Sequence, residues 1–336
     1  MTKQINKIKN IFSIENRTKY FVFVLVCLLT VSVLIFAILI LGNQSLQKRT
    51  IVTTKEKLNA FENITLEGKS AIVFDVINNQ ELFSKNPDEP LPLASLTKIL
   101  TAVVTSKKLK ENQTIKITEK DLSPEGDSGL VVGDIWKMHD LRDFTLLTSS
   151  NDGAFALASI TEKQDPNGSS GENQNNEETE FVKEMNEVAL NLGLTNSKFF
   201  NEHGLDITNQ TTTDQSTKKE SCSGAYGSAR DMATLFEYVL KNYPDILEAT
   251  RYQNLEITSA EKTYEAENTN VYVNKIPNLI ASKTGYTDLA GGNLIIAFDA
   301  GLNRPIIISV LGSTQEGRFT DTLKLVDATI KQLANS

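Results

Sequence analysis

The pattern of apolar and polar positions divides the chain into an N-terminal apolar run and a longer mixed remainder. Residues 21–41 contain no charged side chain and are dominated by Val, Leu, Ile and Phe. At about 1.5 Å per residue, a helix over this run spans about 30 Å, which matches the hydrocarbon core of a bilayer. We therefore predict one transmembrane helix at 21–41.

Charge on either side of the run sets the expected topology. Residues 1–20 carry five basic side chains and one acidic one, Glu15, so the positive-inside rule places them in the cytoplasm and the rest outside. A cleaved signal peptide is the alternative, with a shorter apolar region and a small-x-small site after it. This run ends in Leu41-Gly42-Asn43, a poor cleavage site, which favours an uncleaved signal anchor. The chain stops soon after its last predicted helix, so we expect the anchor at the N-terminus.

The remainder shows strand patterns at both ends and helical patterns between them. Residues 70–85 read as a hairpin that turns at Asn78-Asn79, helical stretches follow to about Leu240, and 293–298 and 305–311 read as adjacent buried strands. A final amphipathic helix presents an apolar stripe made of Phe319, Leu323, Val326, Ile330 and Leu333.

Three polar segments interrupt these patterns. Residues 42–60 form a linker, or in part a continuation of the first helix. Residues 163–179 are rich in Gly, Asn, Ser and Glu with no apolar residue, which predicts a flexible surface insertion. Residues 210–224 form a second loop, either plain surface or overhanging a cleft. Residues 61–336 are thus expected to form one exported domain of the α/β class, an antiparallel sheet flanked by helices plus an all-helical lobe.

Charge and cysteine content limit the partners. The whole chain has a formal net charge of −8, so the part after residue 20 carries −12, which gives no electrostatic footprint for nucleic acid. Cys27 lies in the apolar run and Cys222 in a polar loop, so no intrachain disulfide is expected. Cys222 is either an exposed thiol or a dimer link, and the oligomeric state stays open.

Three short motifs occur in a fixed order. Ser95-Leu96-Thr97-Lys98 is followed 54 residues later by Ser149-Ser150-Asn151, and Lys283-Thr284-Gly285 begins 134 residues after Ser149. Taken singly, each has an ordinary structural explanation: a helix cap with a solvated lysine, a polar turn, or a strand end before a turn. The ordered co-occurrence favours one active site, because S-x-x-K, S-D-N and K-T-G together mark one class of serine acyl-transfer site.

The first motif has the residue types that serine catalysis needs. A serine hydroxyl is a poor nucleophile without an adjacent base. Apolar positions after Pro92 recur at helical spacing, so a helix that begins at Ser95 would set Ser95 and Lys98 on one face. A lysine serves as a base only if burial or a nearby cation lowers its pKa. Lys283 is the candidate for that cation.

Further segments give the chain a family resemblance. Residues 86–99, the N-x-H-G-L-like segment 199–206, Ser228-Ala229-Arg230-Asp231-Met232-Ala233 and Lys283–Thr287 resemble blocks of low-molecular-mass D-alanyl-D-alanine carboxypeptidases, in family order from about Ser70 onward. These are bacterial penicillin-binding serine peptidases. The resemblance implies the β-lactamase/DD-peptidase-like fold, with Ser95 between two lobes and Lys283 on an edge strand. Together with the predicted N-terminal anchor, a bacterial family gives a location in the bacterial cell membrane, with a single pass and the catalytic domain outside.

The resemblance also implies roles for individual residues. Ser95 would attack the peptide carbonyl, Lys98 would move the proton and Ser149 would assist. Asn151 would bind the substrate amide, and Lys283, Thr284 and Gly285 would line the carboxylate site. Backbone amides of Ser95 and Tyr286 would form the oxyanion hole. The substrate would be the peptidoglycan stem pentapeptide, with β-lactams as inhibitors and no cofactor. With only His139 and His203 in the chain, a His-ligated metal site is not expected, and His203 is expected to be structural.

Two departures and several alternatives stay open. The family usually has Gly or Ala where this chain has Ser150, and Ala where it has Gly153, which puts fine positioning in doubt. A class A β-lactamase would need a Glu-x-x-Leu-Asn block between Asn151 and Lys283, and Glu187-Val188-Ala189-Leu190-Asn191 has those letters, so this alternative stays open. An endopeptidase, a transpeptidase or a non-turnover sensor would share the same motifs. Because the basic segment before the apolar run is short, we expect no cytoplasmic effector domain that would receive a sensor's signal.

Overall fold

The computed structural model describes residues 14–49, 59–163, 179–208 and 221–335 in two units, which divide after Leu58. In the first unit, α2 (Ile14–Arg49) contains one stretch, Arg17–Leu41, long and apolar enough to cross a membrane. The helix therefore continues through Arg49, into the segment predicted as a linker. Residues 164–178 of the predicted insertion, 209–220 of the second loop, 1–13 and 50–58 lie outside the described residues.

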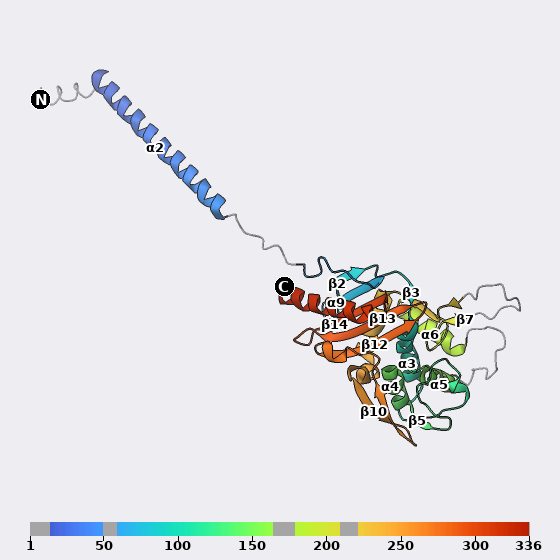
Figure 1. The fold of residues 1–336 in the computed structure, drawn as a ribbon. Helices are drawn as coiled ribbons and strands as arrows, with labels where there is room; N and C mark the ends of the chain where they lie inside the picture. Colours follow the sequence, from blue (N-terminus) through green and yellow to red (C-terminus); the bar gives the residue numbers. More distant parts are fainter. Residues whose placement is uncertain (1–13, 50–58, 164–178, 209–220, 336) are drawn as a thin grey trace. The chain divides into compact units, whose positions relative to one another are not determined.

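The second unit is built on a five-stranded antiparallel sheet, seen beneath α9 in Figure 1. The strand order is β12-β13-β14-β1-β2, so the first and last thirds of the domain meet in one sheet. The predicted hairpin and the adjacency of 293–298 with 305–311 are confirmed. The strands are β1 (Ser70–Asp75), β2 (Gln80–Lys85), β12 (Leu279–Thr287), β13 (Gly291–Asp299) and β14 (Pro305–Ser313).

Both faces of this sheet are buried, and the alternation along β13 shows how. Leu294, Ile296 and Phe298 face α9 (Gly317–Ala334), whereas Ile295 and Ala297 face the helical side. The amphipathic final helix is confirmed, but its apolar stripe was partly misassigned. Ile330 is 38% exposed and Leu325 is fully buried, because the helix also turns Thr322 and Thr329 inward.

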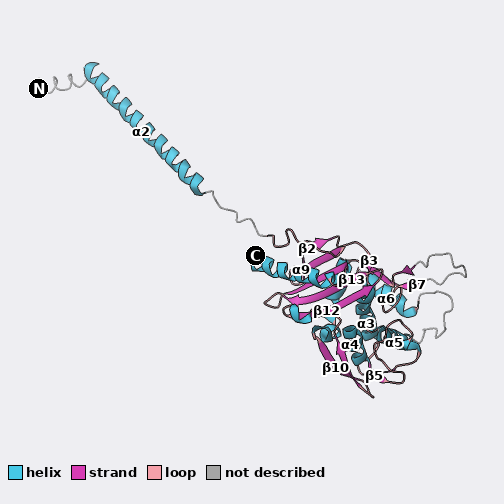
Figure 2. Ribbon diagram, in the orientation of Figure 1, coloured by secondary structure: helices cyan, strands magenta, loops and turns pink. Residues whose placement is uncertain are grey.

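The second lobe is mainly helical, as Figure 2 shows by its cyan helices. The helices α3 and α5 pack against each other, and α4 contacts both. The lobe contains α3 (Thr97–Lys108), α4 (Met138–Thr148), α5 (Asn151–Lys163), α6 (Glu180–Asn191), α7 (Ala229–Asn242) and α8 (Pro244–Glu248).

The helical lobe also contains short strands. Two two-stranded sheets close its far end, where the rings of Trp136 and Tyr264 pack at a tilt, with centroids 4.8 Å apart, beside Phe144 of α4. Further short strands pair with one another elsewhere in the second unit. These elements are β4 (Thr114–Lys116) with β5 (Ile135–Lys137), β10 (Asn254–Thr258) with β11 (Thr263–Glu267), β7 (Ile207–Thr208) with β8 (Ser221–Cys222), and β3 (Leu91–Pro92) with β9 (Ala225–Gly227) and β6 (Lys198–Phe199).

Short 3₁₀ turns complete the second unit, and the first of them contains Ser95. They are η1 (Ala94–Leu96), η2 (Lys120–Leu122), η3 (Ala249–Arg251) and η4 (Val273–Lys275).

Candidate active site

Ser95 lies in the 3₁₀ turn η1, which leads directly into α3. The α-helix therefore begins two residues later than predicted, but the three-residue spacing still brings the Lys98 ammonium to 2.8 Å from Ser95 Oγ. The turn is held in an unusual shape: Ala94 has φ +50°. Gly204 packs so closely against it that a Cβ there would lie 2.0 Å from the Ala94 carbonyl oxygen.

Lys98 is almost fully buried and donates three hydrogen bonds. Its Nζ lies 2.8 Å from Ser95 Oγ, 2.7 Å from Asn151 Oδ1 and 2.7 Å from the His203 carbonyl oxygen. Burial lowers the pKa of Lys98 to about 7, and the charge of Glu202 opposes that shift. Burial, rather than the predicted charge of Lys283, is therefore the cause.

Lys283 lies on the edge strand β12, as predicted, and joins the third motif to the second. Its Nζ donates to Ser149 Oγ at 2.8 Å and to the Thr284 carbonyl oxygen at 3.0 Å. Burial lowers the pKa of Lys283 well below its usual value, and the charges of Lys98 and Arg318 lower it further. Two buried amines thus flank the α4–α5 turn.

Ser149 ends α4 in the left-handed conformation, with φ +63°, and Asn151 begins α5. A non-glycine residue in this region is uncommon and strained, and such strain tends to persist where function requires it. The turn directs Ser149 towards Lys283 and Asn151 towards Lys98. All three predicted motifs therefore meet.

The rest of the third motif passes close to Ser95. A Cβ on Gly285 would lie 3.2 Å from the Ser95 backbone nitrogen and 2.7 Å from the Leu93 carbonyl oxygen, so only glycine allows this approach. Thr284 Oγ1 lies 2.6 Å from Thr269 Oγ1. Tyr286 follows on the same strand and is 47% exposed.

Arg318 is a site residue that the sequence reasoning missed. It lies in the first turn of α9, and its Nη1 donates to the Gly285 carbonyl oxygen at 2.9 Å. Burial lowers its pKa, and its charge acts on Lys283. The only signal in the sequence was a basic residue beside a predicted apolar stripe, which is usual on a solvated helix face.

The segment around His203 contacts Lys98 directly. The His203 carbonyl oxygen accepts a hydrogen bond from Lys98 Nζ, and the His203 Nδ1 accepts one from the Leu205 amide at 3.1 Å. Burial and the charge of Lys98 lower the pKa of His203 to about 3, so the ring is neutral. Asp206 accepts from Thr287 Oγ1 at 3.0 Å and thereby ties this segment to β12.

Gly153, one of the two departures from the family pattern, has a local cause. A Cβ at this position would lie 2.1 Å from Thr145 Oγ1, which donates to the Leu141 carbonyl oxygen at 2.6 Å. Gly153 therefore accommodates Thr145 on the facing helix.

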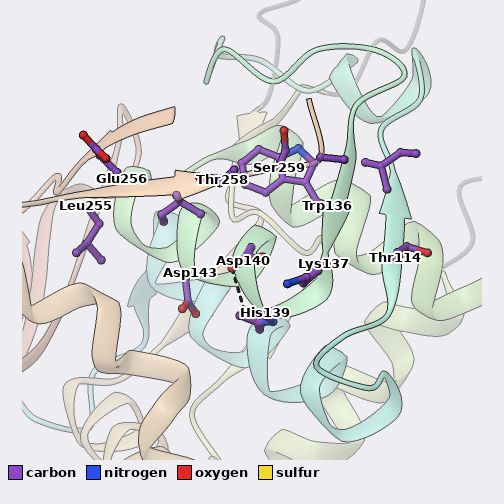
Figure 3. A pocket seen from close by; sticks show the side chains of 13 residues that line it. Thr114, Trp136, Lys137, His139, Asp140, Asp143, Leu255, Glu256, Thr258 and Ser259 are labelled. Atoms are coloured by element: carbon purple, nitrogen blue, oxygen red, sulfur yellow. Dashed lines mark ion pairs between the residues drawn. The ribbon is translucent and has the colours of Figure 1, made fainter. Parts of the chain in front are cut away.

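A cavity of about 730 Å³ lies at the end of the helical lobe, between β5, the start of α4 and β10 (Figure 3). His139 lies in its wall and pairs with Asp140 at 2.9 Å. No motif residue lines this cavity. Within the described ranges, no three or more His, Cys, Asp or Glu side chains are arranged to hold a metal ion.

Comparison with known proteins agrees with this geometry. Residues 54–315 match the family model described as D-alanyl-D-alanine carboxypeptidase. The chain belongs to the D-alanyl-D-alanine carboxypeptidase family. It is 29% identical over 273 residues to D-alanyl-D-alanine carboxypeptidase DacF of Bacillus subtilis, which covers 79% of this chain and 63% of that protein. The chain thus spans about three fifths of the length of DacF.

One further curated protein and one solved structure are also similar to this chain. A D-alanyl-D-alanine endopeptidase of Pseudomonas aeruginosa is 30% identical, over 76% of this chain and 74% of that protein. The ampicillin-bound structure of penicillin-binding protein D2 from Listeria monocytogenes has a TM-score of 0.62 and 27% identity, over 79% of this chain and 98% of that one. The predicted fold is confirmed.

Proposed function

We propose that the protein is a membrane-anchored serine D,D-carboxypeptidase that removes the terminal D-alanine from peptidoglycan stem pentapeptides. The observation that carries the proposal is the buried Lys98 amine, 2.8 Å from Ser95 Oγ and with a pKa of about 7. Family membership supports the same chemistry.

In the first half-reaction, neutral Lys98 takes the proton of Ser95 as Oγ bonds to the carbonyl carbon of the penultimate D-alanine. The Ser95 and Tyr286 amides stabilise the oxyanion. The carbon–nitrogen bond then breaks, and the proton passes to the departing amine, with the hydroxyl of Ser149 assisting. Free D-alanine leaves, and the rest of the peptide is held as an ester on Ser95.

Water completes the reaction by attacking the ester carbon, with its proton taken by Lys98. The bond between that carbon and Ser95 Oγ then breaks, Lys98 returns the proton to Oγ, and the shortened peptide leaves with a new terminal carboxylate. Lys283 and Thr284 bind the terminal carboxylate, beside Gly285. Arg318 adds positive charge there, since its guanidinium contacts the Gly285 carbonyl. Asn151 binds the amide of the peptide, and a penicillin acylates the same serine.

Release of D-alanine tests this proposal. The detergent-solubilised full chain is incubated with diacetyl-L-Lys-D-Ala-D-Ala, with and without prior treatment with benzylpenicillin. We expect D-alanine release that the antibiotic abolishes. Stable penicilloyl adduct without release from the tripeptide would overturn the carboxypeptidase assignment. It would favour the second candidate, an endopeptidase acting on cross-linked strands, a name that two relatives carry.

We also propose that α2 anchors the protein in the bacterial cytoplasmic membrane with residues 1–20 inside, because the stretch Arg17–Leu41 can cross a bilayer and basic residues precede it. In intact cells stripped of their wall, added protease should digest the catalytic domain. Protection until the membrane is permeabilised would reverse the topology, and a mature chain that starts near Asn43 would indicate a cleaved signal peptide.

A further inference from the structure

A polar segment between η2 and β5 lies against the turn that carries the second motif. In this segment, residues 123–130, the Glu125 carbonyl oxygen accepts from Asn151 Nδ2 at 2.6 Å. Ser150 Oγ donates to Ser128 Oγ at 2.7 Å, and Ser128 Oγ donates to Asp152 Oδ2 at 2.9 Å. Three consecutive residues of the turn therefore hold the segment.

The Glu125 contact determines how the Asn151 amide is oriented. Its Oδ1 faces the Lys98 ammonium at 2.7 Å, and one hydrogen of its Nδ2 is taken by the Glu125 carbonyl. A flipped amide would set its NH₂ against the Lys98 donor and its oxygen against the Glu125 oxygen, so both contacts would become repulsive. The second Nδ2 hydrogen is then available to a substrate carbonyl in one defined direction.

The two serine hydroxyls form a chain of hydrogen bonds whose donors and acceptors are fixed. Ser128 has one hydroxyl hydrogen and donates it to the Asp152 carboxylate, so its oxygen can only accept the hydrogen bond from Ser150. Ser150 in turn accepts from the Gly153 amide at 2.9 Å. Ser150 and Asp152 are both 3% exposed, so these two partners of Ser128 are shielded from bulk water. Among the described residues, Asp152 Oδ1 has no partner, which makes the bond to Oδ2 more important for this buried carboxylate.

We propose that Ser150 and Ser128 are positioning residues that hold the Glu125 carbonyl on Asn151 and so aim its amide at the peptide carbonyl of the substrate. This inference rests on the proposed function, in which Asn151 binds that carbonyl. It gives a role to Ser150, which stands where the family usually has Gly or Ala. The chain thus adds a second attachment for the segment beside the Asn151–Glu125 bond.

A double-mutant cycle on the full chain tests the proposal. Ser150→Ala, Ser128→Ala and the double variant are compared for kcat/KM of D-alanine release and for the second-order rate constant of benzylpenicillin acylation. We expect each single change to lower both kcat/KM and the acylation rate constant by about five- to tenfold, the effect of losing one hydrogen bond. The double variant should lose no more than the worse single one, because both hydroxyls act through one bond.

Two matched variants separate positioning from stability. Ser128→Thr keeps the hydroxyl and should restore the rates. Thr329→Val removes a buried hydroxyl that donates to the Leu325 carbonyl at 2.6 Å, three turns along α9 from Arg318. It should lower Tm and leave the rates unchanged.

Additive losses, or lower Tm with rates within twofold of the wild type, would overturn the positioning role. Failure of the proposed function is seen separately, as a wild-type chain that releases no D-alanine. In that case the cycle is still read on penicillin acylation.

Discussion

Replacement of Ser95 by alanine is expected to lower the rates of penicillin acylation and of D-alanine release by at least about four orders of magnitude. The reason is chemical: an acyl-enzyme cannot form without Oγ. The fold should be unaffected, because Lys98 keeps its bonds to Asn151 and to the His203 carbonyl when the Ser95 bond is lost.

Intact-protein mass spectrometry after incubation with benzylpenicillin measures the adduct directly, and thermal unfolding checks the fold. Ser159→Ala, on α5 of the same lobe, is the matched control and should acylate like the wild type. A penicilloyl adduct on the Ser95→Ala chain would show that another residue is the nucleophile, and the assignment of the whole site would then fail.

Sequence reasoning could place Ser95 beside Lys98, because a spacing of three residues brings side chains together in any helical turn. It could not show that Lys98 meets Asn151, or that Lys283 meets Ser149. Those contacts join residues 53 and 134 positions apart, and they depend on how α3, α5 and β12 pack. The family pattern supplied them as an expectation, and the fold brings them within hydrogen-bond distance.

The strongest strands were predictable and the weakest were not. β13 and β14 are long apolar runs buried on both faces, whereas β10 and β11 are five residues each with three exposed positions alternating with two inward ones. Tyr264 and Ala266 are the buried residues of β11, and the alanine and the two glutamates of this strand are residue types depleted in strands, which weakens the signal of Tyr264.

The cause of the Lys98 pKa shift was beyond the sequence as well. A lysine on a helix is ordinarily solvated, and only the packing of the Asn201–Asp206 segment, α5 and β12 around it removes the water. Of the two causes that the sequence left open, burial and a nearby cation, burial is the one that lowers this pKa.

Replacement of Lys98 by methionine is expected to lower kcat/KM and the penicillin acylation rate by about 10²- to 10⁴-fold, the range typical of a lost general base. Lys98→Arg distinguishes a role as a base from a role as a positive charge. It keeps the positive charge and the donors, but a guanidinium stays protonated and cannot accept the Ser95 proton. If Lys98 acts as a base, both variants should be similarly impaired; if it only supplies charge, the arginine should retain most activity.

The dependence of the acylation rate on pH is a second test of Lys98 as the general base. Only the neutral amine can take the proton, and the pKa of Lys98 is lowered to about 7, so the acylation rate should fall about tenfold per pH unit below pH 7 and level off above it. Glu202 raises that pKa, so Glu202→Gln should move the midpoint to lower pH, whereas Lys98→Met should show no such limb. A wild-type midpoint near 10, the ordinary range of a lysine, would mean that burial does not prepare this amine, and the proposed proton transfer would need another acceptor.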